Sequence, residues 1–175
     1  RLARTGLEYI TLSRVSSLSE GRGAEVYRFL KSIGSRYMQF LPVVEHVVDS
    51  PQGGRSPRQL KALTAALRSL SDGPLLIAVD QEGGMVNRLK SRYGFPPTVT
   101  AAAQGASGSP DSASLRAAQT ASVLAGCGIN VNFAPCVDLN LNPSNPIIAR
   151  YGRSFSSDPD SVCLFAGRWV EEHHR

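Results

Sequence analysis

The sequence has 175 residues, enough for one domain with a hydrophobic core. Hydrophobic residues make up 42% of the chain and charged residues 19%, a composition that excludes a disordered protein. The length also excludes a complete (β/α)8 barrel of ordinary size, because such barrels need roughly 200 residues or more.

The charge balance is basic, with 19 Lys and Arg against 14 Asp and Glu and a formal net charge of +5. The basic residues form no block, which favours a solvated basic surface over a nucleic-acid-binding arm. No run of about 18 apolar residues occurs, and the N-terminal RLARTGLEYITLSRV lacks the apolar stretch of a secretion signal. We therefore expect no nucleic-acid partner and no membrane segment. Because the first residue is Arg1, we expect at least an initiator methionine to be missing.

The cysteines are odd in number and lack the CxxC spacing of zinc sites: Cys127, Cys136 and Cys163. This pattern predicts buried or half-buried free thiols rather than a disulfide framework or a metal site. Free thiols are typical of a reducing compartment, so we expect a cytoplasmic location.

The first 55 residues are weakly patterned. Ala24–Ser35 is predicted to be a short helix and Tyr37–Val44 a short strand, although Pro42 argues against a central ladder position at the far end of that strand. A helix is then predicted to start with Ser56 as N-cap and Pro57 in the first turn, and to stop at Asp72-Gly73. Its apolar residues recur at helical spacing: Leu60, Leu63, Leu67 and Leu70.

The remaining chain alternates strands and helices. Leu75–Val79 is apolar without alternation, which predicts a strand buried on both faces, and a long loop is expected over 85–109. A helix over Asp111–Ala125 and a strand over Ile129–Phe133 follow. A last helix starts at Asp158-Pro159 and is expected to bury one face. That face consists of Val162, Phe165, Ala166, Trp169, Val170 and His173.

This alternation predicts an α/β fold with right-handed βαβ units and a parallel sheet. The two clear strands deliver Asp80 and Asp138 at or just past their C-terminal ends. Ligands bind at that edge in both barrels and open sheets, so both aspartates are candidate site residues.

The first candidate site is AVDQEGGMVNR, residues 78–88. The Asp80 carboxylate can accept two hydrogen bonds from neighbouring hydroxyls of a polyol, Glu82 follows closely, and Gly83-Gly84 allows backbone to approach a ligand. Arg88 is near enough to help organise the same pocket. The alternative is a loop whose carboxylate caps a helix or pairs with an arginine.

The second candidate site, residues 132–155, combines arginines, asparagines and prolines with Asp138. Arg150 or Arg153 could donate fork-like hydrogen bonds, and Asp138 either contacts a ligand or orients such an arginine. The Asn-Pro pairs are expected to form turns. Paired carboxylates could support glycosidic chemistry, but spacing alone does not show which of them face one sugar. The histidines are expected in core or surface roles: His46, His173 and His174.

These motifs resemble a known family. PLLIAVDQEGGMVNRL, residues 74–89, closely resembles a signature segment of family 3 glycoside hydrolases, in the β-N-acetylhexosaminidase branch. GINVNFAPCVDLNLNP and RSFSSDP, between residues 128 and 159, look like the next signatures in the same order, and RSPRQLKALTAAL also fits. The resemblance covers residues 56–175. It divides the chain into a poorly matched segment, 1–55, and the N-terminal part of a barrel, 56–175.

The resemblance implies a TIM-type (β/α)8 barrel, present here as an N-terminal portion. It implies removal of terminal N-acetylglucosamine from glycans, often in cell-wall recycling, with retention of configuration through a covalent glycosyl-enzyme. No metal or organic cofactor is implied. By motif matching, Asp80 would bind the sugar hydroxyls, and Arg88 and Arg153 would be further substrate contacts.

The family's catalytic residues have no counterpart here. Its acid/base histidine follows a Lys-His-Phe-Pro-Gly-His type of motif and its nucleophilic aspartate comes later, and neither motif occurs in this sequence. We therefore assign no catalytic residue and expect no turnover by this chain alone. Two alternatives are a non-catalytic remnant that binds sugar or a protein partner, and an unrelated open α/β domain. A partial barrel would leave Phe165 and Trp169 incompletely covered, which favours self-association.

Overall fold

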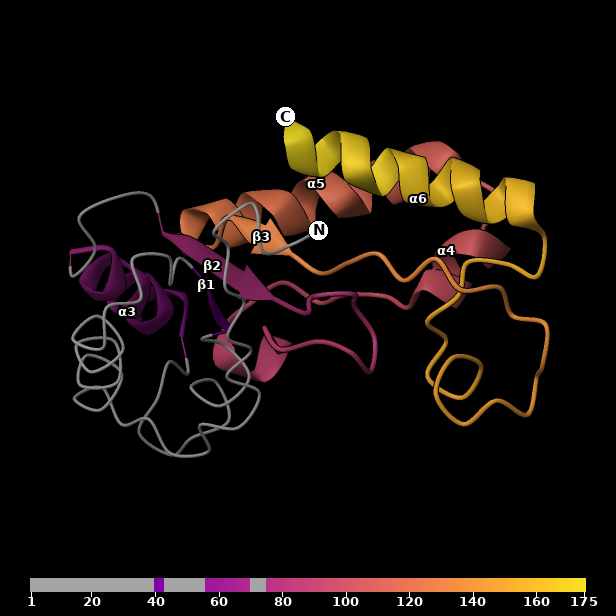
Figure 1. The fold of residues 1–175 in the computed structure, drawn as a ribbon, viewed down its shortest axis with the longest axis horizontal. Coiled ribbons are helices and arrows are strands. Elements are labelled where there is room, and N and C mark those ends of the chain that lie inside the picture. Colours follow the sequence, from indigo (N-terminus) through magenta and orange to yellow (C-terminus); the bar gives the residue numbers. More distant parts are fainter. Residues whose placement is uncertain (1–39, 43–55, 70–74) are drawn as a thin grey trace, which may run out of the picture. The chain divides into compact units, whose positions relative to one another are not determined.

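The computed structural model describes residues 40–42, 56–69 and 75–175 (Figure 1). The chain forms two compact units, residues 1–79 with 126–131 and residues 80–125 with 132–175. The predicted helix Ala24–Ser35, both ends of the predicted strand Tyr37–Val44, and His46 lie outside the described residues.

The described strands form a sheet of order β1-β2-β3. β1 (Phe40–Pro42) pairs in parallel with β2 (Leu76–Val79), with Phe40 opposite Leu76 and Pro42 opposite Ala78. Pro42 is the last residue of β1, where its missing N–H disturbs the ladder least, in agreement with the sequence prediction.

In the first unit, helix α3 (Pro57–Ser69) begins as predicted. The Ser56 hydroxyl accepts a hydrogen bond from the Gln59 N–H at 3.3 Å, and Pro57 occupies the first turn. Leu60 is fully buried, and the buried Thr64 hydroxyl donates to the carbonyl of Cys127 at 2.6 Å. This hydrogen bond ties α3 to the chain that leads into β3.

β2 differs in part from the prediction of a strand buried on both faces. Ile77, Ala78 and Val79 are buried, but Leu76 is 40% exposed. Leu76 and Ala78 point to the same face because side chains alternate along a strand. That face is therefore covered at Ala78 and open at the first residue of β2.

In the second unit, three helices pack together: α4 (Ala101–Ala106), α5 (Pro110–Gly126) and α6 (Pro159–His174), with α5 and α6 running alongside each other in Figure 1. Their shared core consists of Ala101, Ala113, Ala117, Phe155, Val162, Phe165, Ala166 and Trp169. The small alanines let the helices approach closely, and the aromatic rings fill the space between them. The expectation that Phe165 and Trp169 lack cover is wrong, since they are only 5% and 2% exposed.

The stretch predicted as a long loop contains short helices, η2 (Ser91–Tyr93) and α4. Thr100 caps α4 by accepting the Ala103 N–H at 3.1 Å. Gly105 lies inside α4, where a Cβ atom would overlap the carbonyl oxygen of Phe155. A six-residue helix that contains glycine is too short for hydrophobic periodicity to reveal it.

The last helix confirms its predicted start, because the Asp158 carboxylate accepts the Ser161 N–H at 2.9 Å. The side-chain and backbone hydrogen bonds from Ser161 lower the pKa of Asp158. Four of the six residues on the predicted face are buried and His173 is half-buried, but Val170 is 45% exposed. Val170 lies at the edge of the apolar stripe, one residue past Trp169. None of the described helices has the length and hydrophobicity needed to cross a bilayer.

All the cysteines are free thiols, as predicted. Cys127 is buried and Cys136 half-buried, and burial raises the pKa of both thiols. Cys163 is exposed, so the prediction of a buried or half-buried thiol is wrong there. It lies next to Val162 on α6, turned away from the packed face of that helix.

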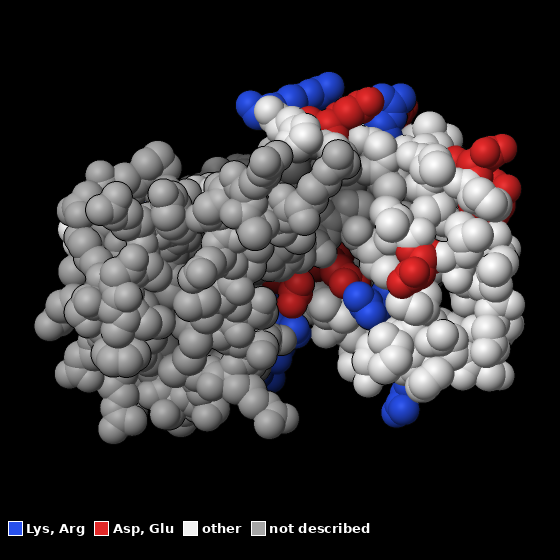
Figure 2. All heavy atoms as spheres, in the orientation of Figure 1, with Lys and Arg blue, Asp and Glu red and all other residues white. Residues whose placement is uncertain are grey.

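Figure 2 shows that, on the face in view, the described Lys and Arg side chains lie among Asp and Glu side chains. They do not gather into one basic patch on this face. Two described ion pairs lie along α6 and at its end, Arg168 with Glu171 at 3.2 Å and Arg175 with Glu172 at 3.0 Å. On the described part of this face, positive side chains are therefore interspersed with negative ones.

Candidate functional site

The loop that leaves β2 turns back on itself. The N–H groups of Glu82 and Gly83 both donate to the carbonyl of Val86 at 3.0 Å. Gly83 and Gly84 have φ of 102° and 59°, and a Cβ atom on Gly83 would overlap the carbonyl oxygen of Val99. The two glycines therefore allow a turn that side-chain-bearing residues could not make.

This turn brings two of the three predicted site residues together. Arg88 Nη2 lies 3.7 Å from Asp80 Oδ2, and their side chains are 24% and 43% exposed. Both remain accessible from solvent, which a residue must be if it is to contact a ligand. A carboxylate beside a guanidinium offers an acceptor and donors at neighbouring points of one surface.

The third predicted residue, Arg153, is held by Glu82. Arg153 donates from Nε and Nη2 to the two carboxylate oxygens of Glu82 at 2.9 and 2.8 Å. The Glu82 side chain is only 9% exposed, and Arg153 is 24% exposed. The hydrogen bonds and the charge of Glu82 raise the pKa of Arg153 above its ordinary value.

Whether Glu82 serves as a ligand contact was open from the sequence. Both of its oxygens bind the guanidinium of Arg153, which corresponds to the alternative of a loop carboxylate paired with an arginine. Glu82 therefore orients Arg153 across 71 positions of sequence. Sequence spacing could not reveal such a pair, because nothing periodic connects its two members.

Of the other residues singled out in the second segment, Asp138 lies near enough to Arg153 for its charge to help raise the pKa of that guanidinium. Asp138 is exposed and accepts a long hydrogen bond from the Cys136 thiol at 3.5 Å. Arg150 is exposed and stacks on the ring of Tyr151, 5.9 Å from its centroid. The asparagines form turns as predicted: Asn145 Oδ1 accepts from two backbone N–H groups just after Pro146.

The side chains of Asn130 and Asn132 bind backbone groups in β2 and next to it. The sequence did not single out either asparagine. Asn130 Oδ1 accepts the Ile77 N–H at 2.7 Å, and its Nδ2 donates to the Leu75 carbonyl. Asn132 does the same at Gln81, with Oδ1 on the N–H at 3.1 Å and Nδ2 on the carbonyl at 3.3 Å. Their alternation with apolar residues in INVNF was the available signal. The side chains supplement the backbone pairing here, since the Asn130 N–H also donates to the Ile77 carbonyl at 3.1 Å. β3 (Val131–Asn132) is shorter than the predicted Ile129–Phe133.

The orientation of the Asn132 amide fixes the tautomer of His173. Reversing that amide would set its NH2 against the Gln81 N–H and its oxygen against the Gln81 carbonyl, so Nδ2 must face His173 Nε2 at 3.1 Å. Nε2 therefore accepts, and Nδ1 carries the proton and donates to the Trp169 carbonyl at 2.9 Å. Burial lowers the pKa of His173 below its ordinary 6.5, which favours this neutral form.

We expect His173 to make the stability pH-dependent. Above pH 6.5 the ring is neutral in both states; as the pH falls below 6.5, the unfolded chain binds a proton that the folded chain resists. The free energy of unfolding should fall until the pH reaches the lowered folded-state pKa. Urea unfolding at several pH values should show that His173→Gln removes this component, while His174→Gln retains most of it, because the charge of His174 contributes less than burial to the lowered pKa of His173. Identical pH profiles for His173→Gln and the unaltered chain would contradict the assignment.

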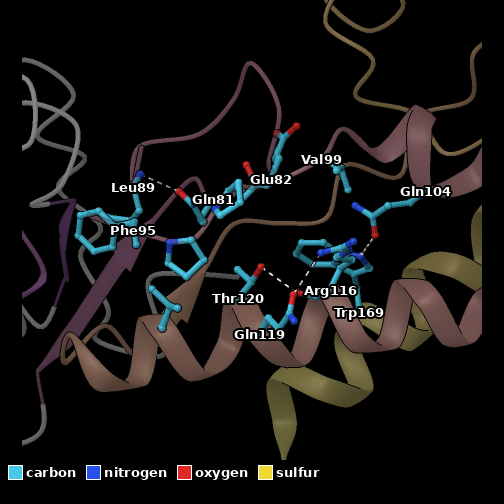
Figure 3. Close-up of a pocket in the computed structure, with 14 residues that line it drawn as sticks. Gln81, Glu82, Leu89, Phe95, Val99, Gln104, Arg116, Gln119, Thr120 and Trp169 are labelled. Atoms are coloured by element: carbon cyan, nitrogen blue, oxygen red, sulfur yellow. Dashed lines mark hydrogen bonds between the residues drawn. The ribbon is translucent and has the colours of Figure 1, made fainter. Parts of the chain in front are cut away.

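An open cavity lies between α5, residues 95–99 and Trp169 (Figure 3). Its empty volume, counted out to the solvent at its mouth, is about 480 Å³. Trp169 Nε1 donates to Gln104 Oε1 at 2.9 Å on one wall. Glu82 borders the cavity, whereas Asp80, Arg88 and Arg153 are not among its lining residues. The cavity is therefore distinct from the predicted sugar contacts. Among the described residues, no group of three His, Cys, Asp or Glu could hold a metal ion.

Comparison with known families identifies the family of this chain. A model of the glycosyl hydrolase family 3 N-terminal domain matches residues 46–175. The chain belongs to this family. The resemblance inferred from the motifs is thereby confirmed, and an unrelated open α/β domain is excluded.

Relatives within family 3 are β-hexosaminidases. One from Alkalilimnicola ehrlichii is 39% identical over 135 residues, which is 74% of this chain and 37% of the relative. NagZ from Neisseria gonorrhoeae, crystallised with N-trifluoroacetyl-D-glucosamine, is 30% identical with a TM-score of 0.63, over 70% of this chain and 37% of that one. A family 3 β-N-acetylglucosaminidase from Paenibacillus sp. is 37% identical with a TM-score of 0.61, over 68% and 23%.

These matches confirm the predicted fold class. The family 3 fold is of the TIM-barrel type, and this chain covers the N-terminal part of it. The chain spans a little more than a third of the length of the first curated relatives. The boundary between residues 55 and 56 stays a prediction.

Proposed function

We propose that this chain is the N-terminal part of a retaining β-N-acetylhexosaminidase and supplies part of the pocket for a terminal N-acetylglucosamine. The observation that carries the proposal is the accessible Asp80–Arg88 pair on the loop after β2, in a chain whose relatives are β-hexosaminidases. Cell-wall recycling is the corresponding role, and the free thiols support a reducing compartment such as the cytoplasm.

We assign the three residues complementary roles at one sugar. The Asp80 carboxylate can accept hydrogen bonds from two neighbouring hydroxyls, and Arg88 beside it can donate to a sugar oxygen. Arg153 already uses Nε and one N–H of Nη2 on Glu82, so its donation to a sugar would come from Nη1 or from the second N–H of Nη2. Such preorganised charged groups lose little conformational entropy when they bind hydroxyls.

The carboxylates in this loop do not form a catalytic pair. Glu82 is committed to Arg153 through both oxygens, so it is not available as acid, base or nucleophile. We therefore propose that these 175 residues bind the sugar without hydrolysing it. Release of phenol from an aryl N-acetylglucosaminide by the purified chain would overturn that part of the proposal.

Replacement of Asp80 tests the sugar site. We expect Asp80→Ala to weaken N-acetylglucosamine binding about ten- to a hundredfold in isothermal titration, because a charged acceptor of hydroxyl hydrogen bonds is lost. Asp111→Ala, at an exposed aspartate in the first turn of α5, is the matched control and should bind as the unaltered chain does. Equal affinities for Asp80→Ala and the unaltered chain would contradict the sugar site, and a partner-binding role would then be the better description.

A further inference from the structure

Gln81 stands between the two acidic residues of the loop, yet its side chain is turned inward. It is only 3% exposed, while its neighbour Asp80 is 43% exposed in its side chain. A buried amide must form hydrogen bonds to be tolerated, and those of Gln81 all go to the loop that carries the candidate sugar contacts.

The oxygen of this amide closes the loop. Gln81 Oε1 accepts the N–H groups of Arg88 at 3.0 Å and Leu89 at 3.1 Å, and the second of these bonds is drawn in Figure 3. The backbone at position 88 is thereby fixed relative to position 81. Since Asp80 directly precedes Gln81, the same contacts set where the Arg88 side chain departs relative to the Asp80 carboxylate.

The nitrogen of the amide connects to the glycine turn. Gln81 Nε2 donates to Asn87 Oδ1 at 2.7 Å, and Asn87 Nδ2 donates to Thr98 Oγ1 at 2.8 Å. Thr98 Oγ1 in turn accepts the Gly84 N–H at 3.2 Å. The backbone of Gln81 is itself held from the other side by Asn132. The Gln81 side chain therefore joins the start of the loop to residues 87–89, and through Asn87 and Thr98 it connects to Gly84 in the middle of the loop.

We propose that Gln81 is a positioning residue for sugar binding. It acts through the Asp80–Arg88 pair by holding the loop in the shape that sets these groups 3.7 Å apart. This inference rests on the proposed function, because it concerns the same sugar. A loop without this anchor would have to become ordered when the sugar binds. The free-energy cost of that ordering would lower the affinity for the sugar.

Two replacements separate the hydrogen bonds from the shape of the side chain. Gln81→Met keeps the length but removes all the amide contacts. We expect it to weaken N-acetylglucosamine binding about tenfold and to lower the hydrogen-exchange protection of the Arg88 and Leu89 amides. Gln81→Glu keeps the acceptor for both amides. Asn87 can turn its amide to donate to the new oxygen, and Thr98 can then donate to Asn87 while still accepting from Gly84. We expect this variant to restore amide protection and affinity to within about threefold of the unaltered chain.

Thr64→Val is the control for general destabilisation. It also removes a buried side-chain hydrogen bond, but in the other unit, and should lower stability while leaving sugar affinity unchanged. Unaltered sugar binding by Gln81→Met, or an equal loss of affinity in Thr64→Val, overturns the positioning role and leaves the proposed function intact. Failure of the unaltered chain to bind N-acetylglucosamine overturns the proposed function, and the inference with it.

Discussion

Trp169→Ala is expected to lower the free energy of unfolding by about 3–5 kcal/mol, the range for removal of a large aromatic side chain from a core. Trp169 is 2% exposed, belongs to the shared core of α4, α5 and α6, and stacks on the His173 ring at a centroid distance of 5.4 Å. Its loss also leaves the buried Gln104 Oε1 without the donor at 2.9 Å. Urea unfolding followed by circular dichroism measures the change, since the variant removes the chain's single tryptophan.

Trp169→Phe separates packing from the hydrogen bond. It retains an aromatic ring but cannot donate to Gln104, so we expect a smaller loss of about 1–3 kcal/mol. Val170→Ala, at the exposed neighbour on the same helix, should change stability by no more than about 0.5 kcal/mol. Equal losses for Trp169→Ala and Val170→Ala would show that α6 does not pack as described.

Glu82→Gln is expected to affect both stability and sugar binding. A glutamine turns an NH2 group toward one of the two Arg153 donors and leaves the guanidinium charge unbalanced. Breaking a fully buried pair costs about 3–5 kcal/mol; because Arg153 remains 24% exposed and can be partly hydrated, we expect about 2–3 kcal/mol. Arg153 is then free to turn, so sugar affinity should fall about tenfold.

The matched control is Glu171→Gln, the same substitution in the exposed Arg168–Glu171 pair, where the side chains are 41% and 55% exposed. Exposed pairs contribute about 0–1 kcal/mol, so this variant should be nearly as stable as the unaltered chain and bind sugar equally well. Denaturant unfolding and titration with N-acetylglucosamine compare the two variants. An effect of Glu82→Gln no larger than that of Glu171→Gln would contradict the role given to the Glu82–Arg153 pair.

Sequence reasoning recovered those parts of the fold whose signals are local. The caps at Ser56 and Asp158 are specified within one turn, α5 is rich in alanine, and α6 is long enough for its apolar stripe to repeat. Short elements were missed because α4 is six residues long and its pattern does not repeat. Burial at the edges of elements, as for Leu76 and Val170, depends on what lies opposite, which spacing along one element does not encode.

The candidate site was predicted less completely than the fold, because the prediction relied on charged side chains. Asp80 and Glu82 attract attention as carboxylates, but the structure exposes one and pairs the other with Arg153, far along the chain. Gln81 between them is uncharged, yet it holds more of the loop than either neighbour. Its role depends on backbone groups that come close only after the turn has formed. No spacing rule connects a buried amide to such partners.

The glycine inside α4 has a consequence for protein engineering. Replacing a helical glycine by alanine is a standard way to gain about 0.4–1 kcal/mol through a stiffer unfolded chain. At Gly105 the new methyl group would meet the carbonyl of Phe155, which is two residues from Arg153. The strain would displace the segment that carries a candidate sugar contact. A thermostabilisation programme should therefore keep Gly105 and seek its gains on the exposed faces of α5 and α6.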